Sequence, residues 1–433
     1  MASHASDKTA LYVSVAVAAV LVLLPFHALF TTWIGSNTGH LDAVRIWKEI
    51  IIVALLPSVL FILFRDKTLK RWFGQSWLVR LIGLYALLHI VLGLIALRAE
   101  RVNSPALIYA LLANLRFLGL FLIVLIVSTH SGFLRKNWKV IVIIPAALVI
   151  AFGLMQRFVL PYDFLRHFGY SPKTIPAYQT VDQKLSYVRI QSTLRGANPL
   201  GAYLVLAIPA FMTIKRRKLG LALIAAGMIA ILFTYSRAAW IGVVLALFAY
   251  GYISIPTARA KRRLVTVSVL LAALASLFVI ILRQNTVVQN VFFHTDNSSK
   301  SSESSNTGRA RALGIGLRDV VREPFGRGPG TAGPASLRND HPSRIAENYY
   351  LQIGQEVGWL GITLFIAIIS MVGYGLWRRR SDKLSRVLLA SLVGISFVNL
   401  LSHAWADDTL GLLWWGLAGI AYSSVILNEK RKR

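Results

Sequence analysis

The chain has 433 residues, 56% of them hydrophobic, and carries no cysteine. This apolar content excludes an ordinary soluble domain and is typical of a helical membrane protein, while the absence of cysteine excludes disulfides, zinc–thiolate sites and a cysteine nucleophile. The formal net charge is +29, but the basic residues form short clusters between apolar runs, so we interpret them as topology signals and expect no nucleic-acid partner.

Crossing a bilayer as a helix takes about 20 mostly apolar residues, and twelve segments of the chain meet this requirement. We predict membrane spans at residues 11–30, 46–64, 77–97, 105–127, 138–160, 197–214, 219–235, 238–255, 264–282, 359–377, 384–402 and 410–427. Only Ser236 and Arg237 separate the seventh span from the eighth, so we expect a tight turn there. The sequence therefore predicts an all-α, polytopic membrane protein that forms one domain over residues 1–433.

The distribution of lysine and arginine predicts which ends of the spans face the cytoplasm. Every second connection is strongly basic: residues 65–71, 135–139, 215–218, 259–263, 378–386 and the tail 430–433. Because cytoplasmic loops carry the excess of positive charge, we expect both termini in the cytoplasm. The outer face then receives residues 161–196, the Ser236–Arg237 turn, the long segment 283–358 between the ninth and tenth spans, and the turn 403–408.

The outer segment 283–358 has three parts with different expected structures. His294–Gly308 is rich in serine and predicts a mobile tether. Arg309–Arg322 mixes arginine with apolar residues near helical spacing, which predicts a helix lying at the outer membrane surface. Gly326–Gly330 has the glycine pattern either of a backbone nest for phosphate or simply of a turn.

Two stretches on the outer face carry arginines that are candidates for binding an anion. Arg189 and Arg195 precede the turn Asn198–Pro199 at the start of the sixth span, and they either snorkel to the interface or present guanidinium groups at a helix N-terminus. Arg237 stands in a tight turn with no acid near it in the sequence, which is unfavourable at the membrane boundary unless the arginine is paired or used. Arginine also suits bidentate recognition of phosphate.

A carboxylate precedes the tenth span. Glu347 is a candidate general base for a hydroxyl group, or else a charge that favours the N-terminus of a helix. If the chain is helical there, Glu347 shares a face with Tyr350 and Leu351. Asp407 and Asp408 are expected to pair with the outer arginines. The sequence has no convincing metal-ligand cluster and no nucleotide-binding loop, so we expect neither a metal nor a cofactor.

Three local motifs follow one another on the predicted outer face. The first runs from Arg189 through Asn198-Pro199 to Leu204, the second is Ser236-Arg237-Ala-Ala, and the third joins Gly326–Gly330 to the stretch Glu347–Gly358. Together with the twelve spans, these motifs resemble the O-antigen ligase family, which comprises O-antigen ligases, related polysaccharide polymerases and some protein O-oligosaccharyltransferases. The family's frequent histidine in the third motif is Glu347 here, which also accepts a proton, and His341 is a second candidate for that role.

This resemblance implies a glycosyltransferase of the bacterial cytoplasmic (inner) membrane with its active site on the extracytoplasmic face. The donor would be a glycan on an undecaprenyl-type lipid diphosphate, and the acceptor a hydroxyl group of a glycolipid such as lipopolysaccharide, a glycan or a protein. Arg189 and Arg237 would hold the diphosphate, and Glu347 would take the acceptor's proton. Further contacts to the diphosphate are expected from Arg195, Arg311, Asn198, Ser236 and Tyr350. Because arginines can neutralise the leaving group, the reaction is expected to need no metal ion.

Three other functions are compatible with the sequence. A polymerase would share the fold and the donor but would extend a lipid-linked chain. A transporter or flippase for lipid-linked glycans would place functional charges in the middle of spans, where Arg116, His89 and His27 are the main candidates. The third is a non-catalytic scaffold. Release of free lipid diphosphate separates an enzyme from the last two, and defined acceptors separate a ligase from a polymerase.

Overall fold

The structure of the chain, a computed structural model, describes residues 2–432 with the exception of 182–183, 286–287 and 290–304. Almost all of its regular structure is helical. The elements, in chain order, are α1 (Ala2–Leu23), η1 (Leu24–Phe26), α2 (His27–Thr38), α3 (Leu41–Arg45), α4 (Trp47–Arg65), α5 (Lys67–Gln75), α6 (Trp77–Arg98), α7 (Ser104–Val127), α8 (Phe133–Phe158), η2 (Phe164–Phe168), β1 (Gln179–Val181), β2 (Lys184–Arg189), α9 (Ala197–Phe211), α10 (Arg217–Phe233), α11 (Arg237–Ser254), α12 (Ala258–Ile281), α14 (Ser305–Arg322), η4 (Gly333–Arg338), α15 (Tyr349–Trp377), α16 (Lys383–Val398), η5 (Ala404–Ala406) and α17 (Asp408–Lys432).

All twelve predicted spans coincide with helices, and nine helical stretches within the described residues are long and apolar enough to cross a membrane. The three shorter helices are α9, α10 and α16, with 15, 17 and 16 residues. The first predicted span, 11–30, is part of a longer apolar stretch, Ser6–Thr38, in which α1 passes into α2 through the 3-10 turn η1. The all-α membrane class is therefore confirmed, whereas twelve crossings remain a prediction.

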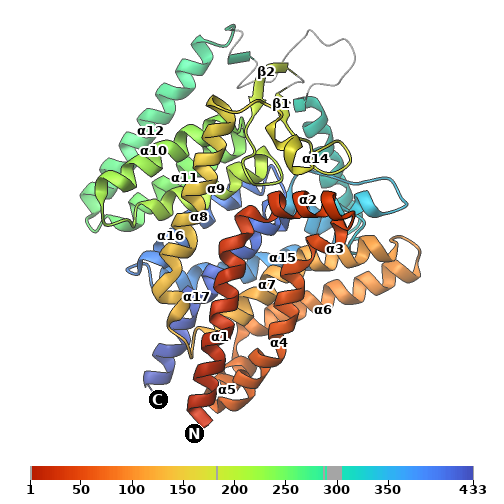
Figure 1. Cartoon of the computed structure of the whole chain (residues 1–433), viewed down its shortest axis with the longest axis vertical. Coiled ribbons are helices and arrows are strands. Elements are labelled where there is room, and N and C mark those ends of the chain that lie inside the picture. The colour runs from red at the N-terminus through yellow and green to blue at the C-terminus, as the bar shows by residue number, and fades with distance from the viewer. Residues whose placement is uncertain (1, 182–183, 286–287, 290–304, 433) are drawn as a thin grey trace.

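The two termini lie at the same end of the molecule (Figure 1). The opposite end carries the short hairpin β1–β2 and helix α14. The hairpin is antiparallel, with Gln179 opposite Arg189, and is a small exception to the predicted all-helical structure. The hairpin belongs to the predicted outer segment 161–196 and α14 to 283–358, so their position at one end agrees with the predicted topology. The assignment of that end to the extracytoplasmic side remains a prediction.

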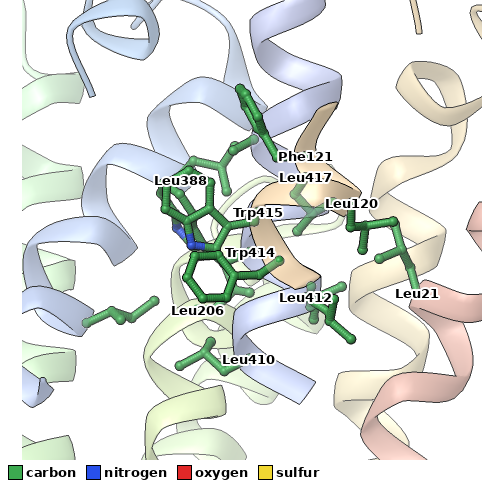
Figure 2. Packing of buried hydrophobic residues seen from close by; sticks show 14 of the residues in the cluster. Leu21, Leu120, Phe121, Leu206, Leu388, Leu410, Leu412, Trp414, Trp415 and Leu417 are labelled. Carbon is green, nitrogen blue, oxygen red and sulfur yellow. The ribbon is translucent and has the colours of Figure 1, made fainter. Parts of the chain in front are cut away.

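Helix α17 lies at the centre of the bundle. Its residues Trp414 and Trp415 are fully buried with ring centroids 5.3 Å apart, and Figure 2 shows them among leucines from several other helices. Phe117 and Phe121 of α7 pack against Trp415. Because lipid tails are as apolar as leucine, such close packing has a larger part than hydrophobic burial in holding membrane helices together. Helix α12, at the edge of the bundle in Figure 1, contributes no buried residue.

Small residues bring α11 close to both α16 and α9. A Cβ atom at Gly394 of α16 would lie 2.2 Å from the carbonyl oxygen of Gly242 in α11, so only glycine fits at this crossing. At the start of α11, Ser236 packs against Gly201 of α9, where an added Cβ would lie 3.2 Å from the Ser236 Cβ. These contacts fix the turn that precedes α11.

The outer segment is shorter than the sequence indicated, and its described part is more helical. The predicted helix at 309–322 is confirmed, but α14 begins at Ser305, so the end of the expected tether is helical; residues 294–304 lie outside the described part. Helix α14 packs on α15 through Gly316 and Val320. The segment ends at residue 348, ten residues earlier than expected, because α15 already begins at Tyr349 and bends at Val357 and Gly358.

The loop Gly326–Gly330 wraps around this bend. The amides of Arg327 and Gly328 donate to the carbonyl oxygens of Gln355 and Glu356 at 2.9 and 2.8 Å, and the Gly330 amide donates to Glu356 Oε1 at 2.8 Å. These amides are committed to protein acceptors, so the suggested phosphate nest is wrong and the turn interpretation holds.

Candidate active site

Arg189 ends strand β2 and is held by two hydrogen bonds from its guanidinium group. Its Nε atom donates to the Thr234 carbonyl oxygen at 2.7 Å, and its Nη2 atom donates to Asn198 Oδ1 at 2.5 Å. Thr234 belongs to the turn before α11 and Asn198 to the first turn of α9. The Asn198 oxygen, which we expected to contact a diphosphate, is thus engaged in positioning Arg189.

Arg237 is the first residue of α11 and follows a tight turn. Tyr235 in this turn has a positive φ of 49°, and the Ser236 amide donates to Thr234 Oγ1 at 3.2 Å. The Ile190 amide donates to the Phe233 carbonyl oxygen at 3.0 Å, which ties the turn to the end of β2. The predicted tight turn between the seventh and eighth segments is therefore confirmed.

Glu347 lies immediately before α15 and not inside it. Its φ is 51°, and the next residue, Asn348, caps the helix by accepting a hydrogen bond from the Leu351 amide at 2.9 Å. The expected common helix face of Glu347, Tyr350 and Leu351 is therefore wrong. The Glu347 carboxylate instead accepts a hydrogen bond at Oε2 from Arg309 Nε, 2.5 Å away.

These segments meet in one cluster of charges, formed by Arg189, Arg237, Arg309 and Glu347. Burial, followed by the positive charges of Arg309 and Arg237, lowers the pKa of Arg189 to about 10, and the Glu347 carboxylate opposes this shift. Counted alone, three guanidinium groups and one carboxylate carry a formal charge of +2. A divalent anion such as a diphosphate matches this surplus, and arginine is the residue best suited to its oxygens.

Strained backbone gathers at the same cluster. Among the described residues, the non-glycine residues with positive φ are Glu100, Ser192, Tyr235 and Glu347. The last three lie in the three segments that carry Arg189, Arg237 and the cluster's carboxylate. Such conformations are unfavourable by about 1–3 kcal/mol each and concentrate at functional sites, where the surrounding structure holds them.

Other predicted site residues lie apart from the cluster. Arg195 Nε pairs with Asp407 Oδ2 at 3.3 Å. Burial lowers the pKa of Arg195, but Asp407, Tyr109 and Asp408 together raise it above its usual value. The Tyr350 hydroxyl donates to the Ser396 carbonyl oxygen of α16 at 3.3 Å. Arg311 is exposed on α14. His341 Nε2 lies 2.7 Å from the Glu100 carbonyl oxygen. His341, the second candidate base, therefore belongs to another part of the surface.

Sequence reasoning missed Arg309. Arg309 is the first arginine of α14, but spacing alone does not tell which arginine of this helix points to Glu347.

Sequence reasoning also left the role of Glu356 open. This fully buried carboxylate accepts from Asn114 Nδ2 of α7 at 2.7 Å and from the Gly330 amide, so it joins α7, the glycine loop and α15. Among the described residues no group of three or more metal-ligating side chains was found.

The fold and the charged cluster describe a multi-pass membrane protein with a polar site at one end of its helices. Residues 219–366 match the family described as O-antigen ligase. The predicted relationship to that family is therefore confirmed for this segment, which includes Arg237, Arg309 and Glu347 and ends inside α15. The match supports a glycan-transfer role in a membrane. A comparison with curated proteins found no match.

Proposed function

We propose that the protein transfers a glycan from a lipid diphosphate to an acceptor hydroxyl at the extracytoplasmic face of the bacterial cytoplasmic membrane. The observation that carries this proposal is the convergence of Arg237, Arg309 and Glu347 on Arg189, from segments far apart in the sequence. A cluster rich in guanidinium groups suits a diphosphate, and the carboxylate beside it suits a hydroxyl group. The family match of residues 219–366 supports the same class of reaction.

In the proposed reaction, the acceptor oxygen attacks the sugar carbon bonded to the diphosphate. The carbon–oxygen bond to the diphosphate breaks, and its electron pair leaves with the lipid diphosphate. The arginines stabilise the negative charge that develops on this leaving group. Glu347 takes the proton of the attacking hydroxyl and later passes it to solvent. Direct attack inverts the configuration at the sugar carbon.

Each residue of the cluster has a separate task in this reaction. Arg189 binds the diphosphate from a position set by Asn198 and Thr234. Arg237 binds it from the start of α11, where Ser236 precedes it. Arg309 holds the Glu347 carboxylate and adds a third positive charge. Arg311 is a weaker contributor on the same helix. Because the arginines supply the positive charge, we propose that catalysis does not require a divalent cation.

The test is glycan transfer by the purified full-length protein from a lipid-linked oligosaccharide. We expect free lipid diphosphate and glycosylated acceptor in equal amounts, with activity preserved in EDTA. Arg189→Ala and Arg237→Ala should each lower the rate by about a hundredfold or more. The matched control is Arg318→Ala, an exposed arginine of α14, which should stay within about twofold of the wild type.

Two outcomes would refute the proposal or part of it. Movement of the intact lipid-linked donor across a vesicle membrane without release of lipid diphosphate would identify a transporter. Loss of activity in EDTA that Mg²⁺ restores would refute the part assigned to arginine in place of a metal. Lipid-linked and other acceptors, compared side by side, decide between polymerase and ligase.

A further inference from the structure

A cavity of about 770 Å³ opens next to Arg195. Its walls come from α2, α3, α4, the start of α7, residues 174–176 and the start of α17. The volume lies within the range of about 300–1,000 Å³ that is usual for small-molecule sites. The residues assigned above to the diphosphate cluster do not line it.

The floor of this cavity is a network of paired charges. Lys48 Nζ lies 3.1 Å from Glu49 Oε2 and 3.0 Å from Asp408 Oδ2, and Arg116 Nη1 lies 2.7 Å from Glu49 Oε1. Arg116 also pairs with Asp408, and His27 Nε2 lies 3.1 Å from Asp408 Oδ2. Asp408 was expected to pair with an outer arginine, but its arginine partner is Arg116 from the middle of α7. The attraction between two buried charges often fails to offset the free energy lost when they leave water. Stability alone therefore does not explain this network, which points to a function.

The mouth of the cavity combines charge with an aromatic ring. Arg195 pairs with Asp407 at 3.3 Å, as the sequence indicated for that aspartate, and it also interacts with the Tyr109 hydroxyl. The guanidinium carbon of Arg338 lies 4.7 Å from the centre of the Tyr109 ring. Arg45 Nη1 lies 3.3 Å from Asp42 Oδ1, three residues earlier in α3.

The chemistry of these walls selects a class of ligand. Two cations face two carboxylates on the floor, and at the mouth Arg195 and Arg45 each face a carboxylate. The charges of the cavity therefore come close to cancelling, unlike those of the cationic cluster around Arg189, and apolar side chains such as Ile108 and Leu112 line the rest of the wall. A lipid tail would leave the charged groups of the floor without hydrogen-bonding partners from the ligand, and a diphosphate finds most cations already paired. A sugar suits these walls, because its hydroxyl groups both donate and accept hydrogen bonds and its ring can lie against an aromatic side chain.

We propose that this cavity binds sugar residues of the acceptor glycan. The inference rests on the proposed function, since a transferase needs an acceptor subsite separate from its diphosphate site. The turn 399–408 links the two places. Beside Glu347, Asn348 Nδ2 donates to the Leu400 carbonyl oxygen at 3.0 Å and the Tyr349 amide to the Asn399 carbonyl oxygen at 2.9 Å, while Asp407 lines the cavity. An acceptor in the cavity therefore lies beside the segment that holds the base.

Binding can be tested without catalysis because the chain has no cysteine of its own. Ser104 is exposed and lines the cavity, so Ser104→Cys introduces a single thiol there. The probes are size-fractionated oligosaccharides released from the cell-surface polysaccharide of the source organism, with inorganic pyrophosphate for comparison. We expect the oligosaccharides to slow maleimide labelling at position 104 of the folded full-length protein. Arg318→Cys, on α14 outside the cavity, is the control and should be labelled at the same rate with or without them.

A second variant assigns the effect to the cavity wall. Arg338→Ala in the Ser104→Cys background should raise the half-protecting oligosaccharide concentration by about tenfold. Absence of protection at position 104, stronger protection by pyrophosphate than by oligosaccharide, or no change with Arg338→Ala would each overturn the acceptor-site inference. Labelling needs no turnover, so this result stands apart from the donor-cleavage assay, whose failure would instead remove the proposed reaction.

If transfer is observed, kinetics give an independent readout of the same site. Arg338→Ala should raise the KM for the acceptor by about tenfold while the KM for the lipid-linked donor stays unchanged. An equal rise in both constants, or a fall in kcat alone, would contradict a role confined to the acceptor.

Discussion

Arg309 Nε and Glu347 Oε2 lie 2.5 Å apart although 38 residues separate them in the chain. The pair joins the first half of α14 to the residue immediately before α15. Gly316 of α14 supports this approach, because an added Cβ there would lie 2.8 Å from the Ala346 Cβ. The proposed base is therefore oriented by a guanidinium group that belongs to the same cluster as the proposed diphosphate ligands.

The first prediction distinguishes two arginines of one helix. Arg309→Ala should lower glycan transfer by about a hundredfold, because it removes a positive charge from the cluster and releases the Glu347 carboxylate. Arg311→Ala should lower transfer by less than about tenfold, since Arg311 is exposed and its charge is screened by solvent. Both rates are measured with saturating donor and acceptor, and Arg318→Ala serves as the control. A larger loss of transfer activity with Arg311→Ala than with Arg309→Ala would show that Arg311, the arginine chosen from the sequence, is the one that assists the reaction.

The second prediction concerns the identity of the base. Glu347→Gln keeps the shape of the side chain but cannot accept the proton, so kcat should fall by about a hundredfold or more. Glu347→His should recover part of the activity. A free histidine has a pKa of about 6.5, so the recovered activity should disappear as the pH falls below that value and histidine becomes protonated. Asp340→Asn, in the same outer segment, is the control, and a fully active Glu347→Gln variant would exclude Glu347 as the base.

Hydropathy and charge were sufficient to predict the helices and the group of outer segments. All twelve apolar segments fall on helices, as expected because only a helix satisfies a backbone within lipid without pairing to another strand, while the number of membrane crossings stays a prediction. The motifs around Arg189, Arg237 and Glu347 were also predicted to meet, and electrostatic contacts join them. The three motifs meet because each lies next to the end of a helix that points towards the same end of the molecule.

Side-chain pairing over long distances could not be predicted from the sequence. Arg189 and Arg195 are close in the chain, and both were expected to contact the diphosphate. The end of the strand directs Arg189 to Asn198, whereas Arg195 pairs with Asp407. The choice of Arg309 over Arg311 depends on how α14 rotates on α15, which spacing in one helix does not determine. The hairpin β1–β2 was missed because two strands of three and six residues carry too short a pattern.

The third prediction tests the orientation in the membrane. Leu185 in β2 and Arg259 at the start of α12 are both exposed, and the cysteine-free chain accepts a single thiol at either position. A membrane-impermeant maleimide should label Leu185→Cys in intact cells, because β2 lies on the predicted outer face. It should label Arg259→Cys only after the cells are permeabilised. The reverse pattern would put the arginine cluster in the cytoplasm and end the case for an extracytoplasmic donor.

The fourth prediction is a pH dependence of stability. Burial, and next to it the positive charge of Arg195, lowers the pKa of His403 to about 4. In the unfolded chain His403 binds a proton with the ordinary histidine pKa of about 6.5. The stabilising contribution of neutral, buried His403 is therefore fully present above pH 6.5 and is lost as the pH falls towards 4. His403→Gln should therefore reduce the loss of thermal stability between pH 6.5 and pH 4, measured for the purified protein in detergent. An unchanged slope would show that His403 does not titrate in this window.

The last prediction concerns the bend that α15 makes beside the glycine loop. Gly358 has φ 69° and ψ −167°, a conformation that is essentially restricted to glycine, and an added Cβ would lie 2.1 Å from the Pro324 carbonyl oxygen. Gly358→Ala should therefore destabilise the fold by at least about 2 kcal/mol. The same substitution should lower transfer, because the bend belongs to the helix that Glu347 precedes.

Gly373 in the same helix provides the matched control. The nearest atom to an added Cβ there is Leu392 Cδ2 at 3.4 Å, which is an ordinary contact, and the backbone is helical. Gly373→Ala should leave the thermal midpoint unchanged or raise it, since alanine is favoured over glycine in a helix by up to about 1 kcal/mol. Equal midpoints for the two variants would mean that the bend at Gly358 relaxes without strain, and the close contact between α15 and the glycine loop would then have no part in holding the site.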